Sequence, residues 1–192
     1  MAKHSDFKKA LKTFKKIAIC SHDAGGAEVL SEIINKVKKK YIFILSGPAK
    51  QIFRRKIGKL KTFNFKSAID NCNILLTSTS IRSNLELEAI SYARKKKIKS
   101  ISVIDHWSRY LQRFIMYNKK ILPNELWTLD IHAFIKSKKI FPNIKIRLFD
   151  NPYFKKIKKN KKIKKNKKIL YLSDNCDDFY KKKGLDYFLF FK

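Results

Sequence analysis

Short apolar runs and amphipathic segments alternate along the first 154 residues of the chain. The helical segments share apolar residues spaced three or four positions apart, as at Ala27, Leu30 and Ile34. The apolar runs predict seven strands, at Lys16–Cys20, Tyr41–Leu45, Lys61–Phe65, Asn73–Thr77, Ser100–Ile104, Leu126–Leu129 and Lys145–Phe149. Strands that alternate with helices indicate the α/β class. We therefore expect a Rossmann-like, doubly wound, mostly parallel sheet with helices on both faces.

One predicted helix carries its own start signal. Ser83-Asn84-Leu85-Glu86 has the spacing of a capping box, in which a serine and a glutamate satisfy the first backbone N–H groups of a helix. The same helix ends in the basic run Arg94–Lys97, where the helix dipole favours cations. A further short helix is predicted over Ile131–Lys138. These signals place helices directly after the fourth and sixth predicted strands.

The chain divides into a central domain and three flanking segments. The α/β domain is expected over 16–154, after an amphipathic segment at 1–15. That segment predicts a helix packed on the domain, with a basic helix on a membrane surface as the alternative. Residues 155–168 repeat the unit KKIKKN and are interpreted as a solvated linker. Residues 169–192 open with an apolar run and are interpreted as the stub of a second domain or a tail.

Length and cysteine content limit the class of protein. With 192 residues, the chain can form one domain with a proper core. Its three cysteines are odd in number, far apart and without a C-x-x-C motif, which argues against a disulfide framework or a zinc site. No stretch approaches the roughly 20 apolar residues of a membrane span. We expect a cytoplasmic protein, with peripheral contact to the anionic inner face of the membrane as a further expectation.

The formal charge of +31 comes mainly from lysine, which supplies 39 of the 46 basic residues. Lysine, isoleucine and asparagine have A/T-rich codons, so a lysine-rich surface is the simplest interpretation. A protein that grips phosphates would more often keep arginine, whose planar fork binds them bidentately. Attraction to anionic lipid or nucleic acid is expected to fade with salt, and specific nucleic-acid recognition is not expected.

Polar residues that could perform chemistry follow four of the predicted strands. In a parallel sheet these strand ends share one edge, where ligands bind, so we predict a cleft there. The candidate catalytic residues are His22, Asp23 and Asp105. The candidate substrate-binding residues are Gly25, Gly26, Ser46, Gly47, Thr77, Ser78, Thr79, Ser80, His106 and Trp107.

His22 suits the role of general base, because histidine titrates near neutral pH. Either Asp23 or Asp105 would orient its imidazole. The glycine pair after His22 lets a ligand approach the backbone at the start of a helix. No metal is expected, because the histidines lack the spacing of metal ligands.

Six sequence blocks between Lys16 and Phe154 carry a resemblance to a known family. In order, the blocks are SHDAGGAEVL, SGPA, TSTSIRSNLELEAI, ISVIDHWSRYLQRF, LPNELWTLD and IFPNIKIRLFDNPYF. Together they resemble the N-terminal half of bacterial GT-B-type proteins, in particular members associated with surface polysaccharide synthesis. This superfamily includes UDP-glycosyltransferases, glycogen phosphorylase and sugar-nucleotide epimerases.

The resemblance implies two Rossmann-like domains with the active site between them. The N-terminal domain would hold the acceptor and the C-terminal domain most of the nucleotide-sugar donor. His22 stands where several of these enzymes carry a catalytic base, and Gly25-Gly26 stands at the family's glycine-rich loop. Asn151-Pro152 would lie near the crossover, and Ile169–Ser173 would open the donor domain.

The chain departs from the family pattern because almost all of the donor domain is missing. The codons of the lysine repeat form A-rich tracts that are prone to slippage, so we expect a frameshifted or split transferase. The resulting hypothesis is the acceptor-side half of a glycosyltransferase, inactive alone and with no cofactor beyond the nucleotide-sugar. The alternatives are a non-catalytic basic module that binds nucleic acid or an anionic membrane, and a stand-alone α/β enzyme. The sequence specifies neither the sugar, the acceptor, the nucleotide nor the oligomeric state.

Overall fold

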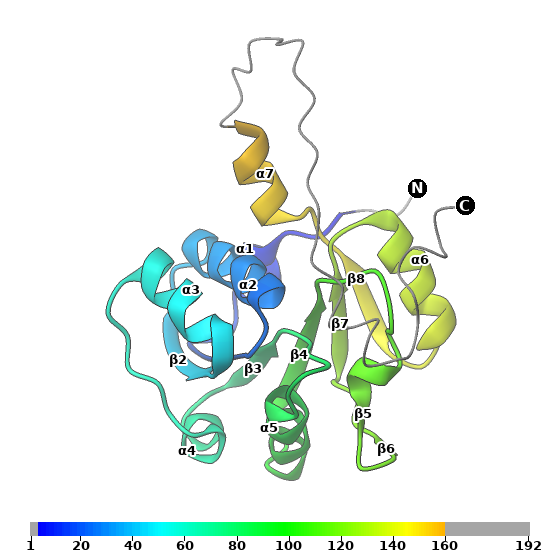
Figure 1. The fold of residues 1–192 in the computed structure, drawn as a ribbon, viewed down its shortest axis with the longest axis horizontal. Helices are drawn as coiled ribbons and strands as arrows, with labels where there is room; N and C mark the ends of the chain where they lie inside the picture. The colour runs from blue at the N-terminus through cyan, green and yellow to red at the C-terminus, as the bar shows by residue number, and fades with distance from the viewer. Residues whose placement is uncertain (1–3, 160–192) are drawn as a thin grey trace, which may run out of the picture. The chain divides into compact units, whose positions relative to one another are not determined.

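A computed structural model describes residues 4–159 of the chain (Figure 1). Its centre is a six-stranded sheet in the order β2-β1-β3-β4-β7-β8, and every neighbouring pair is parallel. These strands are β1 (Lys16–Ser21), β2 (Lys40–Leu45), β3 (Ile74–Thr77), β4 (Lys99–Ile104), β7 (Glu125–Thr128) and β8 (Lys145–Leu148). A small hairpin of β5 (Ile115–Met116) and β6 (Lys119–Lys120) stands apart from the sheet.

Helices cover both faces of the sheet, which confirms the predicted doubly wound α/β fold. One face packs against α1 (Phe7–Ala10), α2 (Ala24–Lys36), α3 (Gly47–Ile57) and α7 (Pro152–Lys159). The other packs against α4 (Phe65–Asp70), α5 (Leu85–Lys95) and α6 (Ile131–Ile140), with a 3₁₀ turn at Gln112–Phe114. Figure 1 shows the two helical layers on either side of the strands.

The strands are nearly continuous apolar runs because both faces of the sheet are buried. Along β1, Ile17 and Ile19 enter one core cluster, while Ala18 and Cys20 enter the other. Such alternation follows from the two-residue period of a strand. Each apolar run in the sequence therefore contributes to two cores at once.

The N-terminal segment packs on the domain. Phe7 lies in the core with its ring stacked on Phe149, at a centroid distance of 4.4 Å. Leu11 is fully buried beside it. The side chain of Asp6 accepts a hydrogen bond from the N–H of Lys9 and starts the helix. The apolar side chains of this segment are thus used within the domain.

The strand predicted at Lys61–Phe65 is wrong. Only Thr62 pairs with the sheet, through an isolated bridge to Phe43. The side chain of Asn64 accepts a hydrogen bond from the N–H of Ser67, and Phe65 is the first residue of α4. A helix cap therefore ends the extended segment before a strand forms.

The winding of the chain fixes where a ligand site can form. From β1 the chain passes to β2 on one side and later returns to β3 on the other side of β1. Strand order therefore reverses between β1 and β3. Open α/β sheets bind ligands in the crevice beyond the carboxyl ends of such strands.

The lysine-rich segment begins within the last described helix. Helix α7 runs into the segment expected as a linker, and Lys156 of this helix pairs with Glu32 of α2 at 3.0 Å. The rest of that segment, and the strand expected at Ile169–Ser173, lie outside the described residues.

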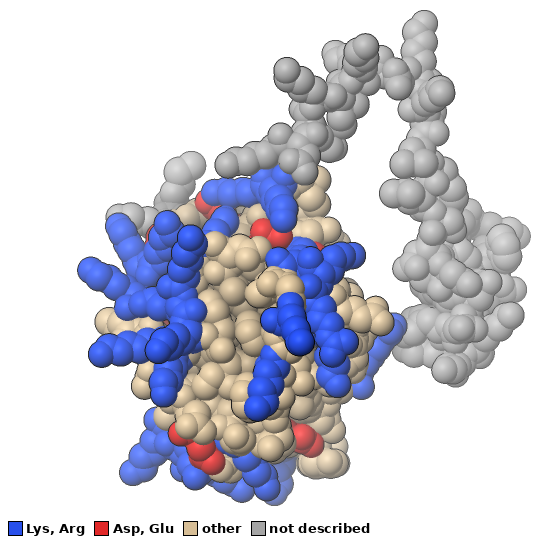
Figure 2. Space-filling model, turned by 90° about the vertical axis from the view of Figure 1, so that its left-hand side faces the viewer, with Lys and Arg blue, Asp and Glu red and all other residues tan. Residues whose placement is uncertain are grey.

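On the face in Figure 2, Lys and Arg far outnumber Asp and Glu and are widely spread. Within residues 4–159, no helix is long and apolar enough to cross a membrane.

Candidate functional site

His22 lies at the carboxyl end of β1 and is held from several directions. Its backbone N–H donates to Glu86 Oε1 at 2.8 Å, and its carbonyl accepts from the N–H of Ala49 at 3.1 Å. Its ring nitrogen Nδ1 lies 2.7 Å from Asp23 Oδ1. Only about a fifth of the side chain is exposed. Backbone and ring are thus both fixed, as a positioned acid–base group requires.

Asp23 orients the imidazole instead of capping the following helix. It stands at the N-cap of α2, yet its side chain makes no capping hydrogen bond. A carboxylate can only accept a hydrogen bond, so we infer that Nδ1 carries the proton and that Nε2 is the acceptor nitrogen of the neutral ring. Of the two carboxylates that could orient His22, the structure brings Asp23 to the ring, whereas Asp105 hydrogen-bonds elsewhere.

Gly47 makes room for this ring at the end of β2. Its φ of +49° lies in the left-handed region, and a Cβ built there would sit 2.6 Å from His22 Nε2. Ser46 is the N-cap of α3, and its N–H donates to the carbonyl of Ser21. The Ser46-Gly47 turn therefore packs beside Nε2 without blocking it with a side chain.

Glu86 belongs to the site and not to a capping box. The N-cap of α5 is Asn84, which makes no side-chain capping bond. Glu86 is 2% exposed, and its Oε1 accepts from the N–H of His22 and the hydroxyl of Ser78. Burial raises the pKa of this carboxyl, and the nearby charge of Asp23 adds to that rise. Ser83 still accepts from the N–H of Leu85 at the start of the helix, but Glu86 makes a tertiary link across the switch point in place of its half of the predicted capping box.

The glycine pair lets α2 approach the two neighbouring strand ends. A Cβ on Gly26 would lie 2.2 Å from the Cβ of Ser78 after β3. A Cβ on Gly25 would lie 2.8 Å from Asp105 Oδ2 after β4. Any side chain at Gly26 would clash, so β1, β3 and β4 meet at this pair.

A second group of polar side chains forms around Asp105. Its Oδ1 accepts from the hydroxyl of Thr79 at 3.0 Å, and that hydroxyl oxygen accepts from Arg113. Burial raises the pKa of Asp105, and the charge of Arg113 opposes the rise. The guanidinium also donates to the carbonyl of Ser108, which ties the loop after β4 to β3.

Two of the four hydroxyl residues at the end of β3, Thr77 to Ser80, serve the scaffold. The hydroxyl of Thr77 bonds Ser102 inside the sheet at 2.7 Å. The hydroxyl of Ser80 accepts from the N–H groups of Arg82 and Ser83 and closes a turn. Ser78 and Thr79 are the pair that contacts the residues around His22 and Asp105.

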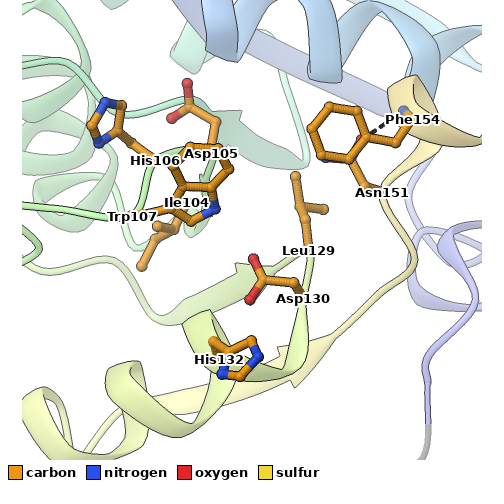
Figure 3. Close-up of a pocket in the computed structure, with 9 residues that line it drawn as sticks. All are labelled: Ile104, Asp105, His106, Trp107, Leu129, Asp130, His132, Asn151 and Phe154. Carbon is orange, nitrogen blue, oxygen red and sulfur yellow. Dashed lines mark hydrogen bonds between the residues drawn. The ribbon is translucent and has the colours of Figure 1, made fainter. Parts of the chain in front are cut away.

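A cavity of about 410 Å³ opens beside these groups at the carboxyl edge of β4 and β7 (Figure 3). It is lined by residues 104–107, by Leu129, Asp130 and His132 at the start of α6, and by Asn151 and Phe154. His106 and Trp107 are exposed there, and His106 Nδ1 bonds Ser108 at 3.2 Å. Asp105 lines the cavity, and its Oδ2 faces Gly25, three residues after His22, although His22 itself is not among the lining residues.

The described residues contain no group of three or more His, Cys, Asp or Glu side chains that could hold a metal ion. Two of the three histidines at this edge bond other side chains. His22 bonds Asp23, and His106 bonds Ser108. What the arrangement offers is an imidazole, buried carboxylates and a cavity, which suit proton transfer.

Several residues of this edge were not predicted as site residues from the sequence. Glu86 has the spacing of a local cap, Asn151 is expected only near the crossover, and Asp130, His132 and Phe154 have no expected role. Arg113 did carry a signal, because it is one of only seven arginines in a chain that otherwise uses lysine. An arginine in such a lysine-rich chain indicates that the position uses the planar guanidinium group.

Comparison with protein-family models, with curated proteins and with solved structures finds no match to this chain. The geometry of the site therefore carries the functional argument.

Proposed function

We propose that the described domain is the acceptor-side half of a glycosyltransferase. In this proposal it activates an acceptor hydroxyl for attack on a nucleotide-sugar in surface polysaccharide synthesis. The observation that carries the proposal is the fixed imidazole of His22, with Asp23 on Nδ1 and Glu86 on the backbone N–H. The resemblance of the sequence blocks to GT-B-type proteins supports the same role. A second domain has to bind most of the donor.

The chemical step needs a base at Nε2 of His22. The acceptor hydroxyl gives its proton to Nε2 as its oxygen attacks the anomeric carbon. The bond from that carbon to the phosphate oxygen breaks, and the nucleoside diphosphate leaves with the electron pair. Asp23 then stabilises the imidazolium through Nδ1–H. Glu86 keeps the ring in place by binding the backbone of His22.

The test measures release of nucleoside diphosphate from a panel of nucleotide-sugars. The chain is assayed together with the donor-binding domain sought in all three reading frames beyond codon 192. His22→Gln should lower kcat by about 10²- to 10⁴-fold, the usual contribution of a general base, while the acceptor Kd changes little. Retained turnover in His22→Gln, or the absence of a donor domain in every frame, contradicts the proposal.

The alternative, a basic module for nucleic acid or anionic membrane, stays a prediction. Its test is binding of the full chain to a nucleic-acid duplex and to anionic vesicles across a salt series, with and without residues 155–168. A binding module should lose affinity and salt dependence together when this segment is deleted. Unchanged binding after the deletion contradicts the alternative.

A further inference from the structure

The cavity beside the His22 site has two exposed aromatic walls. Trp107, in the loop after β4, is 70% exposed, and Phe154, on α7, is 49% exposed. Figure 3 shows their rings on opposite sides of the cavity, with Leu129 between them. Exposed aromatic side chains that line the same cavity offer apolar surface that a ligand can cover. The walls suit a ligand with flat, weakly polar faces.

The polar atoms of the cavity offer hydrogen bonds to hydroxyl groups. Asp130 Oδ1 caps α6 by accepting from the N–H of Ala133, which leaves Oδ2 as an acceptor in the described structure. Asn151 Oδ1 accepts from the N–H groups of Tyr153 and Phe154, which leaves the amide Nδ2 as a donor. A hydroxyl both donates and accepts, so it can pair with either kind of atom.

The charge of the lining is opposite to that of the rest of the molecule. Two carboxylates, Asp105 and Asp130, line the cavity, and no Lys or Arg is among its lining residues in the described structure. A phosphate or other anion would meet these carboxylates, and no lining residue would pair with it as a cation. The lining therefore favours a neutral ligand, although the protein as a whole is strongly basic.

We propose that this cavity binds a neutral pyranose ring of the acceptor between Trp107 and Phe154. The C–H groups on the face of a pyranose carry partial positive charge, which suits the negative face of an aromatic ring. Its hydroxyls pair with Asp130 and Asn151. The cavity volume of about 410 Å³ falls within the roughly 300–1,000 Å³ typical of small-molecule sites. The inference rests on the proposed function and specifies its acceptor.

The test uses the two tryptophans as separate reporters in the full chain. The indole N–H of Trp127 is buried and donates to Glu125, whereas Trp107 is open. Methyl glycosides of glucose, galactose, mannose and N-acetylglucosamine are titrated while both indole ¹H–¹⁵N signals are followed. At least one glycoside should shift the Trp107 signal and leave the Trp127 signal in place. Uridine, UMP and glucose 1-phosphate serve as comparison probes.

Variants decide whether the cavity is the site. Trp107→Ala and Phe154→Ala should each weaken glycoside binding about tenfold or more, as expected for aromatic anchors. Because Trp107→Ala lacks the reporter indole, binding to the variants is measured by isothermal titration calorimetry. Tyr117→Ala is the matched control, because Tyr117 is an exposed aromatic in the β5–β6 turn, away from the cavity. It should change binding less than about twofold, in line with near-neutral surface positions. The Trp127 signal reports that each variant is folded.

The result that overturns the inference is no Trp107 shift with any glycoside, or stronger binding of UMP or uridine than of every glycoside. His22→Gln separates this outcome from failure of the proposed function. It should bind glycosides as the wild type does and yet lose turnover. Lost glycoside binding with His22-dependent transfer to another acceptor overturns only the cavity assignment. Glycoside binding with unchanged turnover in His22→Gln overturns only the role of His22.

Discussion

Replacing Gly26 with alanine tests how closely α2 approaches the end of β3. Gly26 lies in the first turn of α2, where alanine would normally stabilise the helix by about 1 kcal/mol. Here the new Cβ would lie 2.2 Å from the Cβ of Ser78, whereas carbon atoms pack at about 3.5–4.0 Å. One of the two backbones therefore has to move by more than about 1 Å.

Ser78 cannot move freely, because it is bound on several sides. It is 1% exposed, its N–H donates to the carbonyl of Cys20, and its hydroxyl bonds Ser21 and Glu86. Overpacking of this kind costs about 1–3 kcal/mol, and a lost buried hydrogen bond costs about 1 kcal/mol more. After the gain in helix propensity, Gly26→Ala should lower the free energy of unfolding by about 2 kcal/mol.

The assay is urea unfolding of the full chain followed by circular dichroism. Gly25→Ala is the matched control, since its Cβ would meet only a side-chain oxygen of Asp105. It should stay within about 1 kcal/mol of the wild type. The double variant Gly26→Ala/Ser78→Gly removes the clashing atom and should show a favourable coupling of at least about 1 kcal/mol. A Gly26→Ala variant as stable as the wild type would refute the close approach.

Two further predictions test the N-terminal packing and the buried carboxyl. Phe7→Ala should lower the free energy of unfolding by about 3 kcal/mol, because the ring is buried on Phe149, while exposed Lys8→Ala should stay within about 0.5 kcal/mol. Equal stability of both variants in urea contradicts this packing. Burial raises the pKa of Glu86, so its contribution to stability is complete below the unfolded pKa and is lost as pH rises through the folded pKa. In urea unfolding at a series of pH values, the free energy of unfolding of Glu86→Gln minus that of the wild type should therefore increase from acid to neutral pH. A decrease would show that the charged form of Glu86 is favoured in the folded state.

The fold could be predicted because its strands are buried on both faces. Their apolar runs in β1, β3 and β4 stand out from a surface filled with lysine. Strand order could not be predicted, because it depends on contacts between segments far apart in the chain. The error at Lys61–Phe65 came from a short apolar run whose fate was decided by the cap at Asn64.

The shared location of the candidate residues could be predicted from one rule of sheet topology. Parallel strands bring their carboxyl ends together, which is why His22, Asp23 and Asp105 lie at one edge of the sheet. The hydrogen-bond partner of each side chain could not be predicted, because it depends on the tertiary structure. Glu86 has the spacing of a local cap, yet it reaches across the switch point to His22. Phe154 has no predicted site role, and it lines the cavity because α7 follows β8.

The protonation pattern of the His22 ring tests most directly whether this histidine can act as the general base. In ¹⁵N-histidine-labelled full chain at alkaline pH, long-range ¹H–¹⁵N spectra distinguish the tautomers, and His22→Gln assigns the signal among the four histidines. We expect the Nδ1–H tautomer, with Nε2 unprotonated and able to take a proton, because Asp23 accepts from Nδ1. Free histidine favours the opposite tautomer. An Nε2–H tautomer would contradict the assignment of His22 as the base.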